Sequence, residues 1–151
     1  MKTIACTVAT VVGLALLCGC SRQYAKQDFV LGDLGPPSFD LTAIWTASWQ
    51  DPKRSTSETF TMDLVQKGTN VTGTAVFMDA NGTRAEVTGQ ATGSKLRLLM
   101  SPHPTAPYHA IPETTWIGTV TNRAISGTWY FHGKAYRGYA STGPWSATLK
   151  K

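Results

Sequence analysis

The sequence predicts an all-β protein whose fold is an eight-stranded antiparallel up-and-down β-barrel, preceded by a signal peptide and a flexible tether. Three observations support this fold class: apolar residues recur with period two from residue 41 to the C-terminus, short turn signals separate most of the runs, and no run has a helical period. Closing such strands into a barrel removes exposed strand edges, which favours a barrel. A β-sandwich built from the same strands is the alternative.

Each of the first four runs places its apolar or small residues in one phase. The runs are residues 41–49 (Leu41, Ala43, Trp45, Ala47, Trp49), 59–66 (Phe60, Met62, Leu64), 70–78 (Val71, Gly73, Ala75, Phe77) and 83–92 (Ala85, Val87, Gly89, Ala91). The third and fourth runs are joined by Asp79-Ala80-Asn81-Gly82. This segment predicts a hairpin turn, because Asn and Gly accept the positive φ that such turns require.

The last four runs continue the same alternation and contain three of the five tryptophans. They are residues 95–100 (Leu96, Leu98, Met100), 116–120 (Trp116, Gly118, Val120), 125–131 (Ile125, Gly127, Trp129, Phe131) and 145–149 (Trp145, Ala147, Leu149). An apolar-x-Gly unit recurs at Val71-Thr72-Gly73, Val87-Thr88-Gly89, Trp116-Ile117-Gly118 and Ile125-Ser126-Gly127. Since glycine weakens a strand, its recurrence predicts sharp coiling or close packing against a neighbour.

The N-terminus has the features of a segment that is removed. Met1-Lys2 gives a charged start, and residues 4–17 form an uncharged, mostly apolar run that is too short to span a bilayer comfortably. The following Leu17-Cys18-Gly19-Cys20 resembles the bacterial lipobox, which implies cleavage before Cys20 and attachment of fatty-acyl chains such as palmitate to that cysteine. An uncleaved helix, or a cleaved signal peptide with an unmodified Cys20, is the alternative.

These boundaries divide the chain into a signal peptide (1–19), the lipidated cysteine with a linker (20–40) and a barrel domain (41–151). The three cysteines are Cys6, Cys18 and Cys20, so the predicted barrel has no thiol, which excludes a disulfide, a thiolate nucleophile or a Cys metal site there. Cleavage removes one of 14 Lys and Arg and none of nine Asp and Glu. The small positive charge that remains does not indicate nucleic-acid binding.

Two segments of the barrel domain resemble a protein family. Gln66-Lys67-Gly68-Thr69-Asn70-Val71-Thr72-Gly73 and Ile125-Ser126-Gly127-Thr128-Trp129 resemble a mostly uncharacterised class of small bacterial lipocalin-like lipoproteins, over about residues 41–150. The resemblance implies a lipocalin- or avidin-like barrel. The Gly-x-Trp signature of that class departs here to Ala43-Ile44-Trp45, and the resemblance transfers no binding or catalytic residue.

Strand parity assigns every connection to one end of the barrel. The end where the first strand begins, called the base, takes the short turns at 67–69, 93–94 and 121–123. The opposite end, called the mouth, takes the connections at 50–58, 79–82, 101–113 and 132–142, and longer loops favour a binding role. We expect the base to face the membrane through basic side chains, unless these are ordinary solvated turn residues: Lys67, Lys95, Arg123, Lys150 and Lys151.

Function is predicted as a monomeric, non-enzymatic binding module, held on the cell membrane or outer membrane by its lipid, with the barrel in the periplasm or on the cell surface. Charges avoid the inward phase in mid-strand, so a small neutral or apolar ligand at the mouth is the first hypothesis, with these candidate contacts: Trp49, Trp116, Tyr108, Phe77 and Phe131. The second hypothesis is a solid barrel that contacts an envelope protein, for instance as an inhibitor.

Neither hypothesis requires a cofactor or a metal ion. His103, His109 and His132 all fall at the mouth, but no His-x-His or His-x₃-His spacing supports a zinc site. No nucleophile-elbow sequence is present to indicate a hydrolase.

Overall fold

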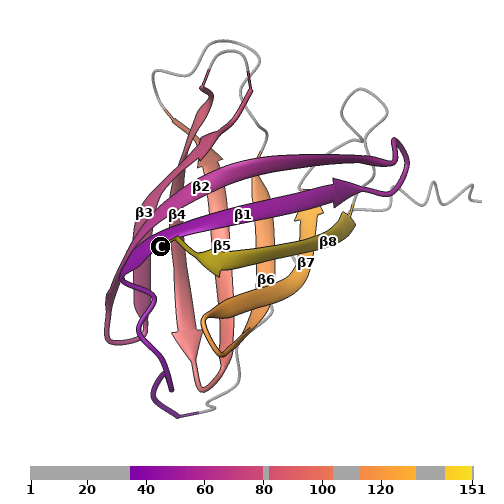
Figure 1. Cartoon of the computed structure of the whole chain (residues 1–151). Helices are drawn as coiled ribbons and strands as arrows, with labels where there is room; N and C mark the ends of the chain where they lie inside the picture. Colours follow the sequence, from indigo (N-terminus) through magenta and orange to yellow (C-terminus); the bar gives the residue numbers. More distant parts are fainter. Residues whose placement is uncertain (1–34, 80–81, 104–112, 132–141, 151) are drawn as a thin grey trace, which may run out of the picture.

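A computed structural model describes residues 35–79, 82–103, 113–131 and 142–150. It is a closed barrel of eight antiparallel strands in sequence order, in which β8 pairs with β1, and the predicted fold class is therefore confirmed. Figure 1 shows β1 and β2 crossing in front of β4, β5 and β6. No helix of membrane-spanning length and hydrophobicity occurs within these ranges. The strands are β1 (Ala43–Asp51), β2 (Thr56–Lys67), β3 (Asn70–Phe77), β4 (Arg84–Thr92), β5 (Lys95–Pro102), β6 (Thr114–Thr121), β7 (Ala124–Phe131) and β8 (Thr142–Leu149).

One connection differs from its prediction. Residues 50–58 were expected to form a long mouth loop, but β1 continues to Asp51 and β2 begins at Thr56, and these two residues pair directly. The hairpin therefore turns within residues 52–55 and extends well beyond the neighbouring strands (Figure 1). The sequence pattern missed this extension because polar residues such as Ser57 and Glu58 carry no apolar period, although backbone pairing does not require one.

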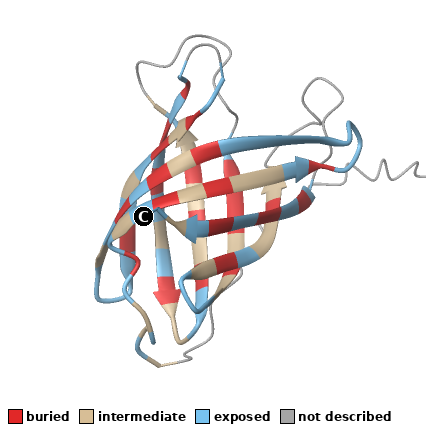
Figure 2. Ribbon diagram, in the orientation of Figure 1, coloured by how far each residue is buried: buried red, intermediate tan, exposed pale blue. Residues whose placement is uncertain are grey.

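The inward phase of the strands is buried, and Figure 2 shows buried residues alternating with more exposed ones along the strands. Trp45, Trp116, Trp129 and Trp145 are each no more than 3% exposed. Trp49 is half-buried and packs against the same cluster, so all five tryptophans face inward as predicted. Phe60 stacks on Phe77 at 4.8 Å between ring centroids, and aromatic side chains therefore occupy the described interior from several strands at once.

The base of the barrel is closed by the segment that leads into β1. Leu41 is fully buried there, and its backbone N–H donates to Oε1 of Gln66 at 2.9 Å. The Gln66 amide also donates to the carbonyl of Phe39, which packs against the core. Ser38 donates its backbone N–H to the carbonyl of Gly93 in the β4–β5 turn. Residues 35–40, which the sequence assigned to the linker, thus lie against the barrel.

Three glycines explain the recurring apolar-x-Gly unit. A Cβ atom added to Gly73, Gly89 or Gly127 would overlap a backbone carbonyl of the neighbouring strand, namely that of Asp63, Arg97 or Ile117 respectively. Each of these glycines lies in a hairpin that turns at the base, at a point where its two strands approach closely. At Gly118 the obstacle is a side chain instead, since an added Cβ would lie 3.0 Å from Cζ2 of Trp145. Close packing against a neighbour, one of the two predicted causes, therefore applies at these glycines.

Candidate functional site

The mouth end of β1 carries an aromatic pair and a buried acid. The rings of Trp49 and Trp129 meet edge to face at 5.0 Å. The indole N–H of Trp129 donates to the carbonyl of Gln50 at 3.0 Å. The β1–β8 pairing ends at Trp49 and Trp145, and the next residue on β8, Pro144, has no backbone N–H to offer. The indole therefore supplies a donor to β1 just beyond the end of the pairing.

Asp51 is the residue at this end that the sequence prediction missed. It is 1% exposed, and its Oδ1 accepts a hydrogen bond from the backbone N–H of Lys53 at 2.9 Å. The period that places Trp45 and Trp49 inward also places Asp51 inward when β1 is extended by two residues. Continuing the alternation past Trp49 would have found it.

The predicted ligand contacts that are described all lie toward the mouth ends of their strands, but they differ in how deeply they are buried. Trp116 lies within the core, where its ring contacts Phe60 at 5.2 Å and Trp145 at 5.4 Å, and its indole N–H donates to Oγ1 of Thr114. Phe77 is also buried, whereas Phe131 is half-buried at the mouth end of β7. Tyr108 lies outside the described residues. Trp49 and Phe131 are therefore the candidates nearest to the surface.

Three carboxylates and one cation interact at the mouth. Burial is the main cause that raises the pKa of the Glu58 carboxyl above its ordinary value of 4.5, and Asp79 and Asp51 raise it further. Arg54 and a hydrogen bond from the Trp49 side chain act in the opposite direction. We call the group formed by Trp49, Arg54, Glu58, Met78 and Asp79 the rim.

The raised pKa of Glu58 gives a pH-dependent prediction. Between pH 4.5 and the raised pKa, the folded state binds more protons than the unfolded state, so the contribution of Glu58 to stability falls as the pH rises through this window. Glu58→Gln removes this contribution. We expect the variant to be slightly more stable than the wild type at pH 7, with the difference shrinking toward pH 4.5.

Urea unfolding at several pH values checks this prediction. Asp63→Asn on the outer wall is the control, because Asp63 is exposed in mid-strand and lies outside the rim. A gain in stability that is the same at pH 4 and pH 7 would contradict a role for the Glu58 proton.

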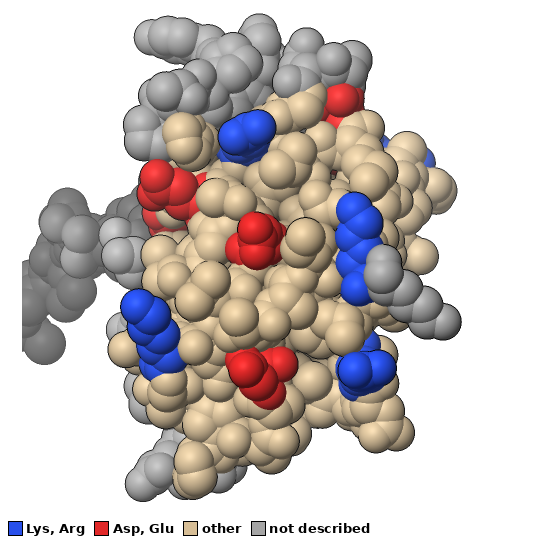
Figure 3. Space-filling view, turned by 60° about the vertical axis from the view of Figure 1, so that its left-hand side comes forward, with Lys and Arg blue, Asp and Glu red and all other residues tan. Residues whose placement is uncertain are grey.

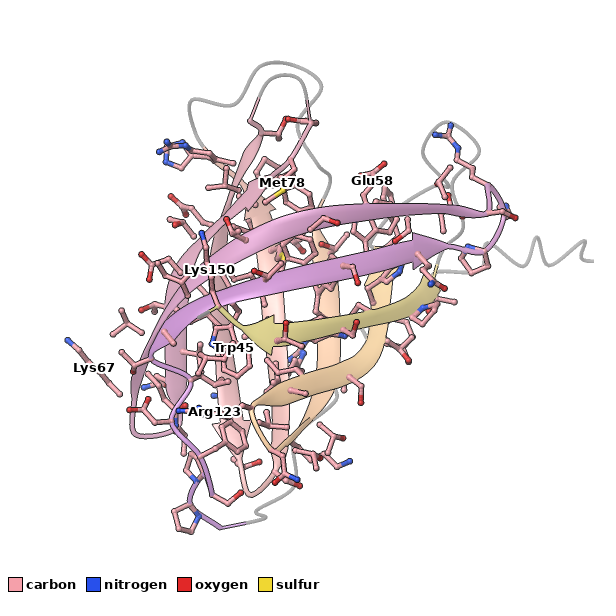
Figure 4. The ribbon with its side chains drawn as sticks, in the orientation of Figure 1. Trp45, Glu58, Lys67, Met78, Arg123 and Lys150 are labelled. Carbon is pink, nitrogen blue, oxygen red and sulfur yellow. The ribbon has the colours of Figure 1, made fainter. Side chains whose placement is uncertain are left out.

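Met78 is the most exposed large apolar side chain of the described residues. It is 67% exposed, while Ile44 and Val65 are 46% and 42% exposed. Its backbone N–H donates to the carbonyl of Thr59, next to Glu58. Figure 4 shows Met78 and Glu58 on the same side of the barrel. The rim therefore combines a flexible apolar side chain with charged groups.

The basic residues predicted for the base lie at that end. Lys67, Lys95 and Arg123 are exposed at the ends or turns of base hairpins, and Lys150 follows the last residue of β8. Nζ of Lys95 donates to Oγ1 of Thr119 at 2.7 Å. Lys67 extends away from the wall in Figure 4, as expected for a solvated cation. Lys151 lies outside the described residues.

On the face seen in Figure 3, acidic and basic side chains occur singly on an otherwise uncharged surface. Of the three histidines, only His103 lies in the described ranges, where its backbone N–H donates to the carbonyl of Arg84. His109 and His132 lie outside these ranges. Among the residues that are described, no three His, Cys, Asp or Glu side chains are grouped so as to hold a metal ion.

No protein-family model matches the chain, and no curated protein sequence matches it. The candidate function therefore depends on the chain itself.

Proposed function

We propose that the protein is a lipid-anchored envelope module whose barrel is a filled, non-enzymatic scaffold, and that its rim contacts a protein partner. Its anchor is Cys20, and its lipobox and barrel motifs are those that resemble lipocalin-like lipoproteins. The base, with Lys67 and Lys95, faces the lipid surface. The mouth then points away from the membrane, toward the periplasm or the cell exterior.

The observation that carries this proposal is the occupied interior. A barrel of eight strands has room for its own side chains or for one small ligand. Here Trp116 contacts three aromatic rings: Phe60, Trp129 and Trp145. The only polar atom of its side chain, the indole nitrogen, donates a hydrogen bond to Thr114 within the barrel. Since the side chains that would line a ligand cavity contact one another, recognition by the outer surface is the better supported function.

The rim supports a protein contact in particular. Methionine is flexible and polarisable, and exposed methionines suit surfaces that adapt to a partner. Met78 is exposed at the mouth end of the wall, where its backbone N–H bonds the residue next to Glu58, and the β1–β2 hairpin carries Arg54. Apolar and charged groups at the same end of the barrel offer a partner both contact area and specificity.

A small apolar ligand at the mouth is the second candidate. Trp49 favours it, because this ring is only half-buried and stands edge to face with Trp129. Such a ligand would stack on the outer part of the aromatic cluster without entering the barrel.

Site-specific photocrosslinking in intact cells tests the proposed contact. The full chain carries p-benzoylphenylalanine in place of Met78 at the rim, or in place of Thr74 on the exposed wall of β3, the strand that ends one residue before Met78. We expect one discrete protein adduct from position 78 and none from position 74. A Cys20→Ser variant should lose both its membrane association and the adduct.

Two results would overturn the proposal. Equal adduct formation at positions 74 and 78 would show that the rim has no special role. Adducts from position 78 with phospholipid alone would show that the mouth faces the membrane, which reverses the predicted orientation.

A further inference from the structure

A hollow of about 270 Å³ lies on the outer wall near the base, away from the rim. It crosses β3, β4 and β5 and is lined by Asn70, Thr88, Gly89, Gln90, Arg97 and Leu99. The side chains include a guanidinium, two amides and a hydroxyl. None of these six residues is acidic, so the hollow offers donors and positive charge to a ligand.

The strand registers align these donors in one row. Lys67 lies opposite Asn70, Asn70 opposite Gln90, and Gln90 opposite Arg97. Side chains directly opposite each other on adjacent strands have Cβ atoms about 5 Å apart. Two cations therefore flank two amides along a row that runs across four strands. Lys67 is exposed at the end of the row and adds positive charge there.

Arg97 is the charged residue of the hollow, and its Nε–H lacks an acceptor among the described residues. It is half-buried, and its Nε–H is enclosed by protein without a hydrogen-bond partner among the described residues. An enclosed donor without an acceptor is unfavourable. The outward-facing acid on the adjacent strand is Glu86, four residues from Gln90 along β4, or about 13 Å at the usual rise per residue. The charge of Arg97 is thus left for a ligand.

We propose that this hollow binds a phosphate group. An arginine fork donates two parallel hydrogen bonds to an oxyanion, and the amides of Asn70 and Gln90 supply further donors from the side. Donors spread over three strands suit a tetrahedral anion better than a planar carboxylate. The volume exceeds the roughly 30 Å³ share of one water several-fold, which leaves room for the atoms that carry the phosphate.

Two sources could supply this phosphate, a lipid headgroup or a free phosphate. The hollow lies close to the base, so the headgroup source rests on the proposed orientation of the base toward lipid. The site itself does not depend on the rim, and either can fail without the other.

Titration of the full chain in detergent micelles tests the site. The measured signal is the ¹⁵N–¹H resonance of Arg97 Nε, followed against inorganic phosphate, and separately against a short-chain phosphatidylglycerol and sodium acetate. We expect a saturable shift with phosphate. Binding should be at least tenfold weaker in Arg97→Gln and in Gln90→Ala. Because Arg97→Gln lacks the Nε resonance, binding to that variant is followed by the backbone N–H resonance of Gln90. Arg84→Gln removes the same charge from the mouth end of β4 and should change the affinity less than twofold.

Each outcome decides a point. A shift that rises linearly without saturation, or an equal loss in Arg84→Gln, would overturn the site, and acetate binding as tightly as phosphate would overturn the choice of ligand. If phosphatidylglycerol saturates the shift at much lower concentrations than inorganic phosphate does, the natural ligand is a lipid headgroup. If only inorganic phosphate saturates it, the ligand is free phosphate. Arg97→Lys keeps the charge without the fork, so restored binding in that variant would contradict the bidentate contact.

Discussion

Gly127→Ala is expected to destabilise the barrel by about 3 kcal/mol, at the upper end of the range for overpacking. An added Cβ would overlap the carbonyl oxygen of Ile117 and would lie 2.7 Å from Cα of Gly118. Both neighbours are backbone atoms of the paired strand β6, so no side-chain rotation relieves the overlap. Urea unfolding followed by tryptophan emission measures the loss.

Two other glycines provide a graded control. In Gly118→Ala the two closest atoms belong to side chains, Cγ2 of Ile125 at 2.8 Å and Cζ2 of Trp145 at 3.0 Å, while the nearest backbone atom lies at 3.4 Å, so this variant should lose less stability. Gly68 has open space around it and a φ of +61°, so Gly68→Ala should lose about 1 kcal/mol from backbone strain alone. An equal loss in all three variants would show that strand approach is not what selects glycine at position 127.

Trp116→Ala is expected to lose about 3–5 kcal/mol, the usual cost of removing a large buried aromatic side chain. The side chain is 2% exposed and contacts Phe60, Trp129 and Trp145. Since the free energy of unfolding of a domain this size is about 5–15 kcal/mol, this loss is a large share of the total stability. Trp116→Phe keeps a ring in place and should lose less. Chemical denaturation of both variants measures these differences.

Trp49→Ala separates a core role from a rim role. Trp49 is half-buried at the mouth, so its removal should cost clearly less than removal of Trp116. If Trp116→Ala is as stable as the wild type, the ring of Trp116 lines a ligand cavity and is not part of a packed core. In that case the ligand hypothesis would replace the proposed partner contact.

Most of the fold could be predicted from the sequence because alternate residues of a barrel strand face inward, so apolar residues recur with period two. Trp45, Phe60 and Trp145 are examples of this inward phase. The predicted strand positions fail where the period has no apolar members, as in the β1–β2 hairpin at Asp51 and Thr56, which pair through backbone alone. The docking of residues 35–40 was missed for a similar reason, since it depends on the side chain of Gln66 and on backbone bonds to Gly93, which leave no periodic signal.

The candidate site was less accessible to sequence reasoning. The inward phase identifies Trp116 and Phe77 but does not say whether inward rings line a space or fill it, and that depends on distances such as the 5.2 Å between Phe60 and Trp116. The hollow at Arg97 is a property of strand register. Asn70, Gln90 and Arg97 are separated along the chain, and only pairing places them in one row.

Uptake of a small apolar probe tests the filled interior most directly. Apolar cavities in proteins bind benzene or xenon, whereas a packed core offers them no space. We expect the ¹H–¹³C methyl spectrum of the wild-type protein to be unchanged at the methyls of Leu98 and Ile125 when benzene is added, and the same methyls to shift saturably in Trp116→Ala, or in Trp116→Phe if only that variant folds. Saturable shifts of these methyls in the wild-type protein would contradict the filled barrel.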